Sequence, residues 1–372
     1  MYYRGFAWLP LLVLICTATS AQSVVDRGTA SVVVQREGMK LLRDSRVRAL
    51  SLGLYLDGEL LTQHFGELNA GQRDAPTDAS VYDIASVTKT MLGYLVAAAV
   101  ENGQVQLDDD VRDYLPAPYP NLAFNGEPVR IRHLLTHTAG LPGMLPLAWN
   151  GVFESLESNV PERFAGLQRR LGKADFWSDL ATVSLSEPPG TRYTYSSAGC
   201  EILAYVLEQV TGQSLADQLR ENLWGPAGMS TAALLPTDTA FLVRGYWMDN
   251  AKPAAYAASP LWGGGSGVTA TLPDLLRYAA LQLETEDPVV SRSHEILYTG
   301  DGRRIAYLWN VREDRYGRYF EHHGGSAGIQ NWLFVLPRYD LAISVIVNHS
   351  GPKTPRKLSR LVQRVLKGIV SE

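Results

Sequence analysis

The sequence predicts an α/β fold: an antiparallel sheet flanked by helices and built from both ends of the chain, with a mostly helical domain inserted between them. Residues 47–65 are rich in β-forming side chains around the turn Asp57-Gly58, and residues 329–347 form a second strand pair near the other end. Residues 355–370 place apolar side chains at helical spacing. Because each end supplies parts of one sheet-and-helix layer, we expect the two ends to pack together.

The middle of the chain has helical patterns separated by long loops, with glycines at the expected stops. The candidate helices are residues 86–101, 131–135, 199–210, 214–222 and 273–283. We therefore assign residues 22–110 and 255–372 to the sheet domain and residues 111–254 to the inserted, mostly helical domain.

Residues 1–21 differ from the rest of the chain. Arg4 gives a positive start, residues 6–16 are mostly apolar, and small residues follow, which is typical of a cleaved secretory signal peptide. The alternative is a lipid anchor on Cys16, but Ile15 stands where such sites usually have a small residue. The predicted location is periplasmic or secreted. No later segment is long enough for stable membrane insertion.

Composition excludes several classes of protein. The 372 residues include 34 basic and 38 acidic side chains, a formal net charge of −4, so no nucleic-acid partner is expected. Apolar residues make up 46% of the chain, which is enough for a buried core. The only cysteines are Cys16 and Cys200, so the mature chain has no internal disulfide. Cys200 lies in an apolar run and is interpreted as a small buried residue, not a nucleophile.

One serine and one lysine have the spacing of a nucleophile and its base. Lys89 and Lys353 each have a serine three residues before them, but Gly-Pro between Ser350 and Lys353 resists a helical turn. Ser86 begins the helical pattern of residues 86–101, which places Ser86 and Lys89 on one face near the electropositive N-terminus. A lysine one turn away can take the serine proton if burial lowers its pKa. By itself, this spacing is more typical of a capping serine and a solvated lysine.

Four segments resemble, in matching order, the motifs of the serine β-lactamase and penicillin-binding-protein superfamily, class C-like branch. Asp83 to Thr90 resembles the nucleophile motif, and Ile131 to Pro142 resembles a signature of that branch. Pro189 to Gly199 is similar to the second motif, usually Tyr-x-Asn. His322 to Gly328 is similar to the third, written His-x-Gly where penicillin-targeted members have Lys-Thr-Gly. The resemblance extends from about residue 45 to 350 and implies the β-lactamase/transpeptidase-like fold.

The resemblance also implies roles for individual residues. Ser86 would attack a carbonyl and become acylated, while Lys89 and Tyr195 would share the proton transfer. The backbone N–H groups of Ser86 and Ser326 would form the oxyanion hole. Substrate-binding roles are implied for Ser197, His323 and Gly325.

Two of these positions depart from the patterns of penicillin-targeted relatives. Ser197 replaces the usual asparagine, and a hydroxyl cannot offer the two N–H donors of an amide, unless water compensates. His323 stands where those relatives offer a permanently charged lysine. An imidazole with an unperturbed pKa of about 6.5 is largely neutral at pH 7. This favours neutral esters over substrates that carry a carboxylate.

The segment Gly324 to Gly328 satisfies Gly-x-Ser-x-Gly, the nucleophile-elbow pattern of another class of hydrolase. That nucleophile elbow needs a helix after it, whereas a strand is expected from residue 329. Asp340 and His349 follow in the right order, but the whole triad would lie within 24 residues, too few for that fold.

Two ligand-binding patterns are also interpreted as structural. His133 and His137 have the i,i+4 spacing of metal ligands, but no His-Glu-x-x-His motif or cysteine cluster supports a zinc site. The glycine run of residues 263–267 lacks the lysine of a phosphate-binding loop and is expected to be a turn lining the cleft.

The predicted function is therefore that of an exported serine hydrolase that cleaves a small ester, amide or peptide through an acyl-Ser86 intermediate, without metal or cofactor. An esterase-like activity is the first choice. The alternative is a β-lactamase, D,D-peptidase or D-aminopeptidase acting on cell-wall-type substrates. A hypothesis from another class is a non-catalytic homologue that senses a ligand. The sequence does not determine the oligomeric state.

Overall fold

The structure, a computed structural model, describes residues 25–370, so the predicted signal peptide lies outside the described residues. Within them, the central element is an eight-stranded sheet in which all neighbours are antiparallel. In spatial order its strands are β2 (Glu59–Gly66), β1 (Ala49–Leu56), β14 (Leu341–Val347), β13 (Gln330–Leu336), β12 (Gly317–Gly325), β11 (Asn310–Asp314), β10 (Arg303–Ile305) and β9 (Tyr298–Gly300).

The two ends of the chain meet in the middle of this sheet, as predicted. β1 pairs with β14 in a register that places Leu50 opposite Val347 and Leu56 opposite Leu341. β1 turns into β2 at Asp57-Gly58, where both residues have positive φ. The predicted α/β class, with an antiparallel sheet flanked by helices and built from both termini, is confirmed.

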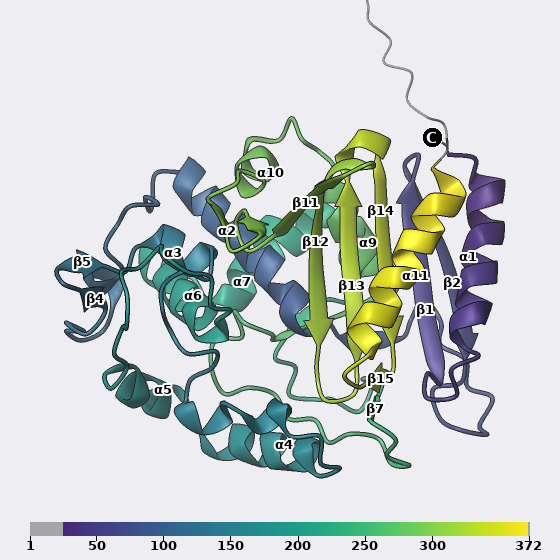
Figure 1. Cartoon of the computed structure of the whole chain (residues 1–372), viewed down its shortest axis with the longest axis horizontal. Coiled ribbons are helices and arrows are strands. Elements are labelled where there is room, and N and C mark those ends of the chain that lie inside the picture. The colour runs from purple at the N-terminus through teal and green to yellow at the C-terminus, as the bar shows by residue number, and fades with distance from the viewer. Residues whose placement is uncertain (1–24, 371–372) are drawn as a thin grey trace, which may run out of the picture.

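Two helices cover one face of the sheet, α1 (Arg27–Leu41) and α11 (Thr354–Ile369). They lie side by side, purple and yellow in Figure 1. The apolar side of α11, which includes Leu361 and Val365, is fully buried in a core shared with strand residues such as Ile343. The sequence analysis predicted α11 but not α1.

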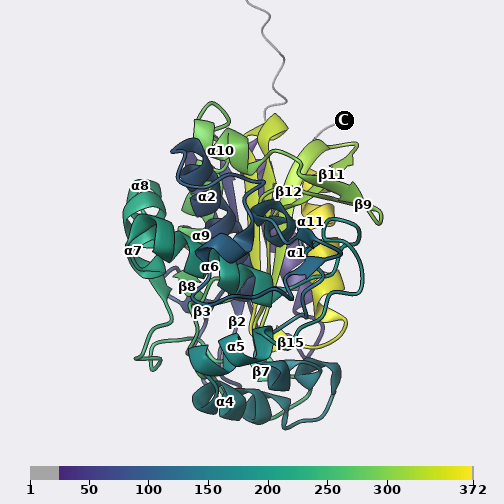
Figure 2. The ribbon, with the colours of Figure 1, turned by 90° about the vertical axis from the view of Figure 1, so that its left-hand side faces the viewer.

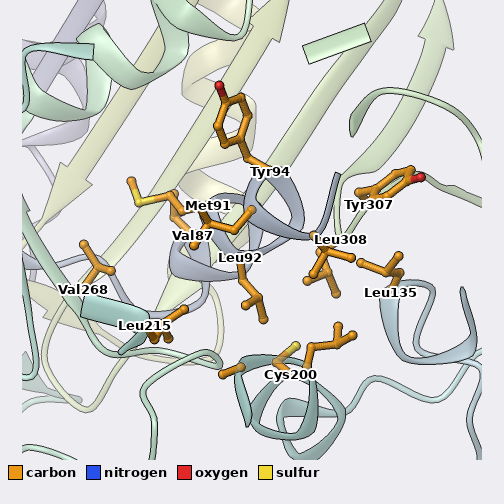
Figure 3. Close-up of a cluster of buried hydrophobic side chains, with 14 of the residues drawn as sticks. Val87, Met91, Leu92, Tyr94, Leu135, Cys200, Leu215, Val268, Tyr307 and Leu308 are labelled. Carbon is orange, nitrogen blue, oxygen red and sulfur yellow. The ribbon is translucent and has the colours of Figure 1, made fainter. Parts of the chain in front are cut away.

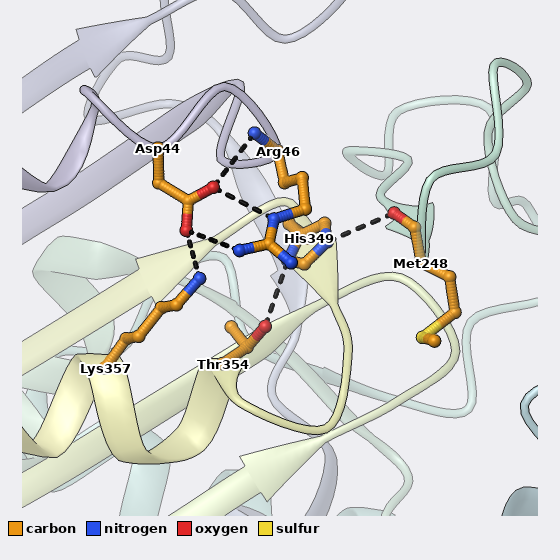
Figure 4. A network of polar contacts seen from close by, with 6 residues as sticks. All are labelled: Asp44, Arg46, Met248, His349, Thr354 and Lys357. Atoms are coloured by element: carbon orange, nitrogen blue, oxygen red, sulfur yellow. Dashed lines mark hydrogen bonds and ion pairs between the residues drawn. The ribbon is translucent and has the colours of Figure 1, made fainter.

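A polar network fastens this helical layer to the loops beside it (Figure 4). Asp44 accepts hydrogen bonds from Arg46, at 3.0 Å, and from Lys357 of α11. The hydrogen bond from Arg46 is the largest influence that holds the pKa of Asp44 below its usual value. His349 contacts Thr354 Oγ1 at 3.0 Å and the Met248 carbonyl at 3.1 Å. His349 thus contacts Thr354 and Met248. It does not act as the triad histidine of the nucleophile-elbow hypothesis.

The other face of the sheet is covered by α9 (Leu272–Leu281), which packs on β1 and β14. Next to it lies α2 (Thr88–Glu101), which the predicted boundaries place in the sheet domain. α2 packs against α6 (Ser197–Thr211) and α10 (Pro288–Ser293). Figure 3 shows Met91 and Leu92 of α2 among buried side chains that include Cys200 and Leu308. This packing makes α2 a rigid base for the residues at its start.

Figure 2 shows α6 in front of the sheet, and the remaining elements are short. They are β3 (Val81–Asp83), η1 (Ala85–Val87), η2 (Val111–Tyr114), β4 (Ala123–Phe124), β5 (Glu127–Pro128), α3 (Ile131–Leu135), η3 (Leu147–Trp149), η4 (Val152–Glu154), α4 (Val160–Arg170), α5 (Lys173–Leu180), α7 (Leu215–Leu219), the π-helical η5 (Arg220–Trp224), α8 (Gly225–Ala227), β6 (Ala233–Leu234), β7 (Tyr246–Trp247), β8 (Val268–Thr271), η6 (Pro337–Tyr339) and β15 (His349–Ser350). Helices α4 and α5 were not predicted. Within residues 25–370, no helix is long and apolar enough to cross a membrane.

Candidate active site

Ser86 lies in η1, a single tight turn between β3 and α2. The Ile84 backbone holds this turn from two sides: its N–H donates to the Val268 carbonyl at 3.1 Å, and its carbonyl accepts from Asn331 Nδ2 at 3.1 Å. Ala85 has φ +47°, an uncommon value for a residue with a side chain. Its N–H donates to Asp83 Oδ1 at 2.8 Å. The turn next to Ser86 is thus strained and fixed by bonds to both β8 and β13.

Lys89 follows one helical turn later and its side chain is 0% exposed. Its Nζ donates to Ser86 Oγ at 3.2 Å and to the Gly265 carbonyl. Burial by itself lowers the pKa of Lys89, but the surrounding acidic groups, Tyr195 first among them, more than offset this and raise it. Lys89 is therefore an ammonium ion, not the solvated lysine of a simple helix start.

Tyr195 reaches the same serine oxygen from the loop before α6. Its Oη donates to Ser86 Oγ at 2.8 Å, and the Lys89 ammonium lies 5.0 Å from the centre of its ring. His137 holds the loop: its carbonyl accepts from Thr194 N at 2.7 Å, and its Nδ1 accepts from Ser196 N at 3.3 Å. Burial keeps the pKa of His137 well below its usual value, so the imidazole is neutral and can accept that bond.

The three predicted catalytic side chains are thus brought together at one atom, Ser86 Oγ. They come from two segments more than 100 residues apart, and their contacts are 2.8 and 3.2 Å long. This arrangement can move the serine proton and hold a compensating positive charge beside it.

The predicted oxyanion-hole donor Ser326 has its backbone N–H occupied. That N–H donates to the Ile329 carbonyl at 2.9 Å, across the turn between β12 and β13. In an antiparallel ladder, alternate residues point their N–H groups toward and away from the partner strand. Gly325, paired with Gln330, is the next residue along, so its N–H points away from β13. Gly325 and Ser86 line the same two cavities. The geometry therefore does not support a Ser326 N–H in this role and offers that of Gly325.

The two histidines of the third motif lie on opposite faces of β12. His323 Nε2 contacts Gln330 Oε1 at 2.6 Å, and its ring lies 5.1 Å from that of Trp332. His322 is 3% exposed, and burial, with the Lys89 charge as the next cause, lowers its pKa to about 3. Burial also lowers the pKa of His323. Both imidazoles are therefore neutral at pH 7, and it is His322 that faces the charge of Lys89.

Two cavities meet at Ser86. The first, about 200 Å³, is lined by apolar side chains such as Met144, Phe153 and Phe164, by the ionisable Asp83 and Arg244, and by the predicted substrate-binding residue Ser197. The second, about 510 Å³, runs past Tyr195 and both imidazoles. Among the described residues lining it, Arg303 is the only one with a formal charge, and its guanidinium stacks 4.5 Å above the Tyr193 ring.

The alternative sites that the sequence already made less favourable are not assembled in the described residues. Asp340 follows β13 at the end opposite Ser326, so it cannot complete an elbow triad. His133 accepts the Arg130 N–H at 3.1 Å within its own helix start, which fits the structural interpretation. In residues 25–370 no group of three or more His, Cys, Asp or Glu side chains is placed to hold a metal ion. Cys200 is fully buried, and burial raises the pKa of its thiol to about 12, so it is not a nucleophile.

Comparison with known proteins decides the family. The Beta-lactamase family model matches residues 31–367. The chain belongs to the beta-lactamase family. It is a serine hydrolase, and the recognition made from its four motifs is confirmed.

Several members of the family are similar over most of the chain. The D-alanyl-D-alanine-carboxypeptidase/endopeptidase AmpH of Escherichia coli K12 is 22% identical over 361 residues, covering 91% of this chain and 90% of AmpH. Penicillin-binding protein 4 of Amycolatopsis lactamdurans is 29% identical over 338 residues, covering 83% and 82%. A crystal structure of a beta-lactamase/D-alanine carboxypeptidase from Yersinia pestis superposes with a TM-score of 0.77 at 20% identity, covering 92% of this chain and 99% of that one, and shows the shared fold.

Proposed function

We propose that this beta-lactamase-family hydrolase cleaves an ester or amide through an acyl-Ser86 intermediate. The observation that carries the proposal is the convergence of Tyr195 Oη, at 2.8 Å, and Lys89 Nζ, at 3.2 Å, on Ser86 Oγ. A serine hydroxyl needs a base within hydrogen-bond distance, and Ser86 has the only such arrangement in the described site.

The proton path follows from these contacts. To act as the base, Tyr195 first releases to solvent the proton with which it hydrogen-bonds to Ser86 Oγ. The phenolate, next to the Lys89 ammonium, then takes the proton of Ser86 as Oγ bonds to the substrate carbonyl carbon. The charge that develops on the carbonyl oxygen is stabilised by the N–H groups of Ser86 and Gly325. Collapse of this intermediate breaks the bond to the leaving group, which receives the proton from Tyr195. Water then attacks the acyl-enzyme, with Tyr195 again as base, and Ser86 is regenerated.

The first candidate for the substrate is a neutral ester. His322 and His323 are both neutral at pH 7 because burial lowers their pKa values, so neither provides the permanent charge that would hold a carboxylate. The apolar side chains of the first cavity, such as Phe153 and Phe164, suit a short acyl or alkyl group. Ser197 in the same lining presents a hydroxyl where an amide side chain would recognise a peptide bond.

A second candidate is a peptide that ends in a free carboxylate. Arg303 favours it, because a guanidinium on the wall of the second cavity can pair with an anion. Two similar proteins favour the same chemistry by their names, the D-alanyl-D-alanine-carboxypeptidase/endopeptidase AmpH and the beta-lactamase/D-alanine carboxypeptidase of Yersinia pestis. We rank it second because His322 and His323, which line the same cavity, are both neutral at pH 7.

One screen tests both candidates and the non-catalytic hypothesis. The mature protein is assayed against p-nitrophenyl esters, nitrocefin and D-alanyl peptides, and separately labelled with a fluorophosphonate probe. We expect labelling of Ser86 and fastest turnover of a short neutral ester. Faster turnover of D-alanyl peptides would favour the second candidate. Absence of both labelling and turnover would favour a ligand-sensing protein. We further propose export, guided by residues 1–21, which fractionation of cells that express the full chain would test.

A further inference from the structure

A buried carboxylate is connected to the nucleophile through Gly265 and Lys89 and is not part of the motifs discussed above. Glu201 is on α6, one turn after Ser197, and is 6% exposed. Its Oε2 accepts the backbone N–H groups of Trp262 and Gly263, each at 3.0 Å, and its Oε1 accepts that of Gly265 at 2.8 Å. A single side chain therefore fixes the conformation of the glycine-rich loop through three bonds.

Gly265 links this carboxylate to the catalytic lysine. Its N–H donates to Glu201, and its carbonyl accepts from Lys89 Nζ. A Cβ at Gly265 would lie 3.1 Å from both Glu201 Oε1 and Ser197 Cβ, tighter than ordinary contact, so glycine is what permits the loop to pack on α6. A continuous series of hydrogen bonds thus runs from Glu201 through Gly265 and Lys89 to Ser86.

The charges along this series complement each other. Lys89 has no contact with solvent, and a buried ammonium needs a nearby negative charge. Cys200 does not provide one, because burial raises the pKa of its thiol to about 12 and leaves it neutral. Burial raises the pKa of Glu201, although the three N–H donors and the Lys89 charge act in the opposite direction. Both carboxylate oxygens accept backbone N–H groups, the arrangement that suits an ionised carboxylate. Glu201 is therefore the acidic group that this series of hydrogen bonds offers to balance Lys89.

We propose that Glu201 is a positioning residue for the acylation of Ser86: it holds the Gly265 carbonyl where the Lys89 ammonium docks, and its charge keeps Lys89 protonated while Tyr195 takes up and releases the serine proton. The inference rests on the proposed function, since it requires Ser86 to be the nucleophile. Glu201 acts through other groups and does not touch the substrate.

The test measures how fast a fluorophosphonate probe labels Ser86 between pH 6 and 11, which requires no knowledge of the natural substrate. Glu201→Gln keeps the size of the side chain, removes its charge and turns an NH₂ group toward at least one loop N–H. We expect the labelling rate at pH 7.5 to fall by about 10–100-fold. We also expect the fall in rate on the alkaline side, where Lys89 loses its proton, to move about one pH unit lower.

Glu37→Gln is the matched control. Glu37 is a buried glutamate of α1, on the opposite face of the sheet, and accepts from Arg36 at 3.0 Å and Arg364 at 2.6 Å. We expect this variant to lower thermal stability and to leave both the labelling rate and its pH dependence unchanged.

The outcomes separate the inference from the proposed function. A folded Glu201→Gln variant that is labelled as fast as the wild type overturns the inference. A variant that is labelled slowly, but whose rate falls at the same alkaline pH as that of the wild type, also overturns it, because the role of Glu201 is then only structural. If Glu201→Gln does not fold, Glu201→Asp replaces it. This variant keeps the charge but moves it away from the loop. We therefore expect labelling to be about fivefold slower or more, with the fall in rate at alkaline pH unchanged. A labelling rate equal to that of the wild type overturns the inference. A wild-type protein that is not labelled at Ser86 refutes the proposed function and the inference together.

Discussion

Replacing Tyr195 by phenylalanine should slow the acylation of Ser86 by roughly two to four orders of magnitude, the range measured for loss of a general acid–base group. The substitution deletes only Oη, the atom 2.8 Å from Ser86 Oγ. It keeps the ring, including its contact with His137 at a centroid distance of 4.6 Å. Because Tyr195 is 39% exposed, loss of its hydroxyl should affect the free energy of unfolding very little.

A double-mutant cycle with Lys89→Met shows how the loss of acylation rate is shared between Tyr195 and Lys89. At about 1.36 kcal/mol per factor of ten, the loss on Tyr195→Phe corresponds to about 2.7–5.4 kcal/mol of transition-state stabilisation. Lys89 and Tyr195 both contact Ser86 Oγ and act on one proton. We therefore expect the double variant to be little slower than the slower single variant.

The assay is stopped-flow measurement of p-nitrophenol release, which separates acylation from later steps. Tyr205→Phe serves as the control, because Tyr205 is on α6 and packs on Trp177 at a centroid distance of 4.9 Å, away from Ser86. Its rate should stay within threefold of the wild type. A Tyr195→Phe rate within threefold of the wild type, or strictly additive losses in the cycle, would refute the shared proton path.

Two further predictions concern charge. His323→Lys should raise the ratio of kcat/KM for a D-alanyl peptide over that for a neutral ester about tenfold at pH 7.5. In the wild type, whose His323 pKa is lowered, this ratio should rise only below the usual imidazole value of 6.5. An unchanged ratio in the variant would count against a substrate-binding role for His323. Asp44→Asn should lower the free energy of unfolding at pH 7, measured by urea unfolding. A carboxyl with a lowered pKa stabilises the fold only while it is ionised, so the difference in this free energy between wild type and variant should shrink as the pH falls below the usual carboxyl value of 3.8. A difference that stays constant down to pH 3 would contradict this.

Local sequence patterns predicted what depends on local geometry. The three-residue spacing of Ser86 and Lys89 fixes their contact once α2 forms, and the alternating strands near both termini fix the sheet. Helix α1 was not predicted because it contains weak helix formers: Gly28, Gly38 and a run of valines. These residues make its helical pattern hard to detect in the sequence. Its stability comes from packing on the sheet and α11, which a local pattern does not reveal.

The parts of the site that could not be predicted depend on register and on long-range contacts. Whether Gly325 or Ser326 points its N–H toward Ser86 is decided by the position of the turn between β12 and β13, and one residue of shift reverses the answer. The same alternation places His322, not His323, on the side of Lys89. Glu201 meets the glycine loop across 61 to 64 residues of sequence, so no spacing rule connects them. The only signal in the sequence is a glutamate one turn after Ser197, next to the apolar residues Ile202 and Leu203.

The central claim is that Ser86 carries the acyl group, and trapping that species tests it most directly. The protein is mixed with a p-nitrophenyl ester, quenched in acid within milliseconds to seconds, and examined by intact-mass spectrometry and peptide mapping. We predict a mass increase of one acyl group on the peptide that contains Ser86, its loss in Ser86→Ala, and its persistence in Ser326→Ala. An acyl group on Ser326, or undiminished turnover by Ser86→Ala, would contradict the account.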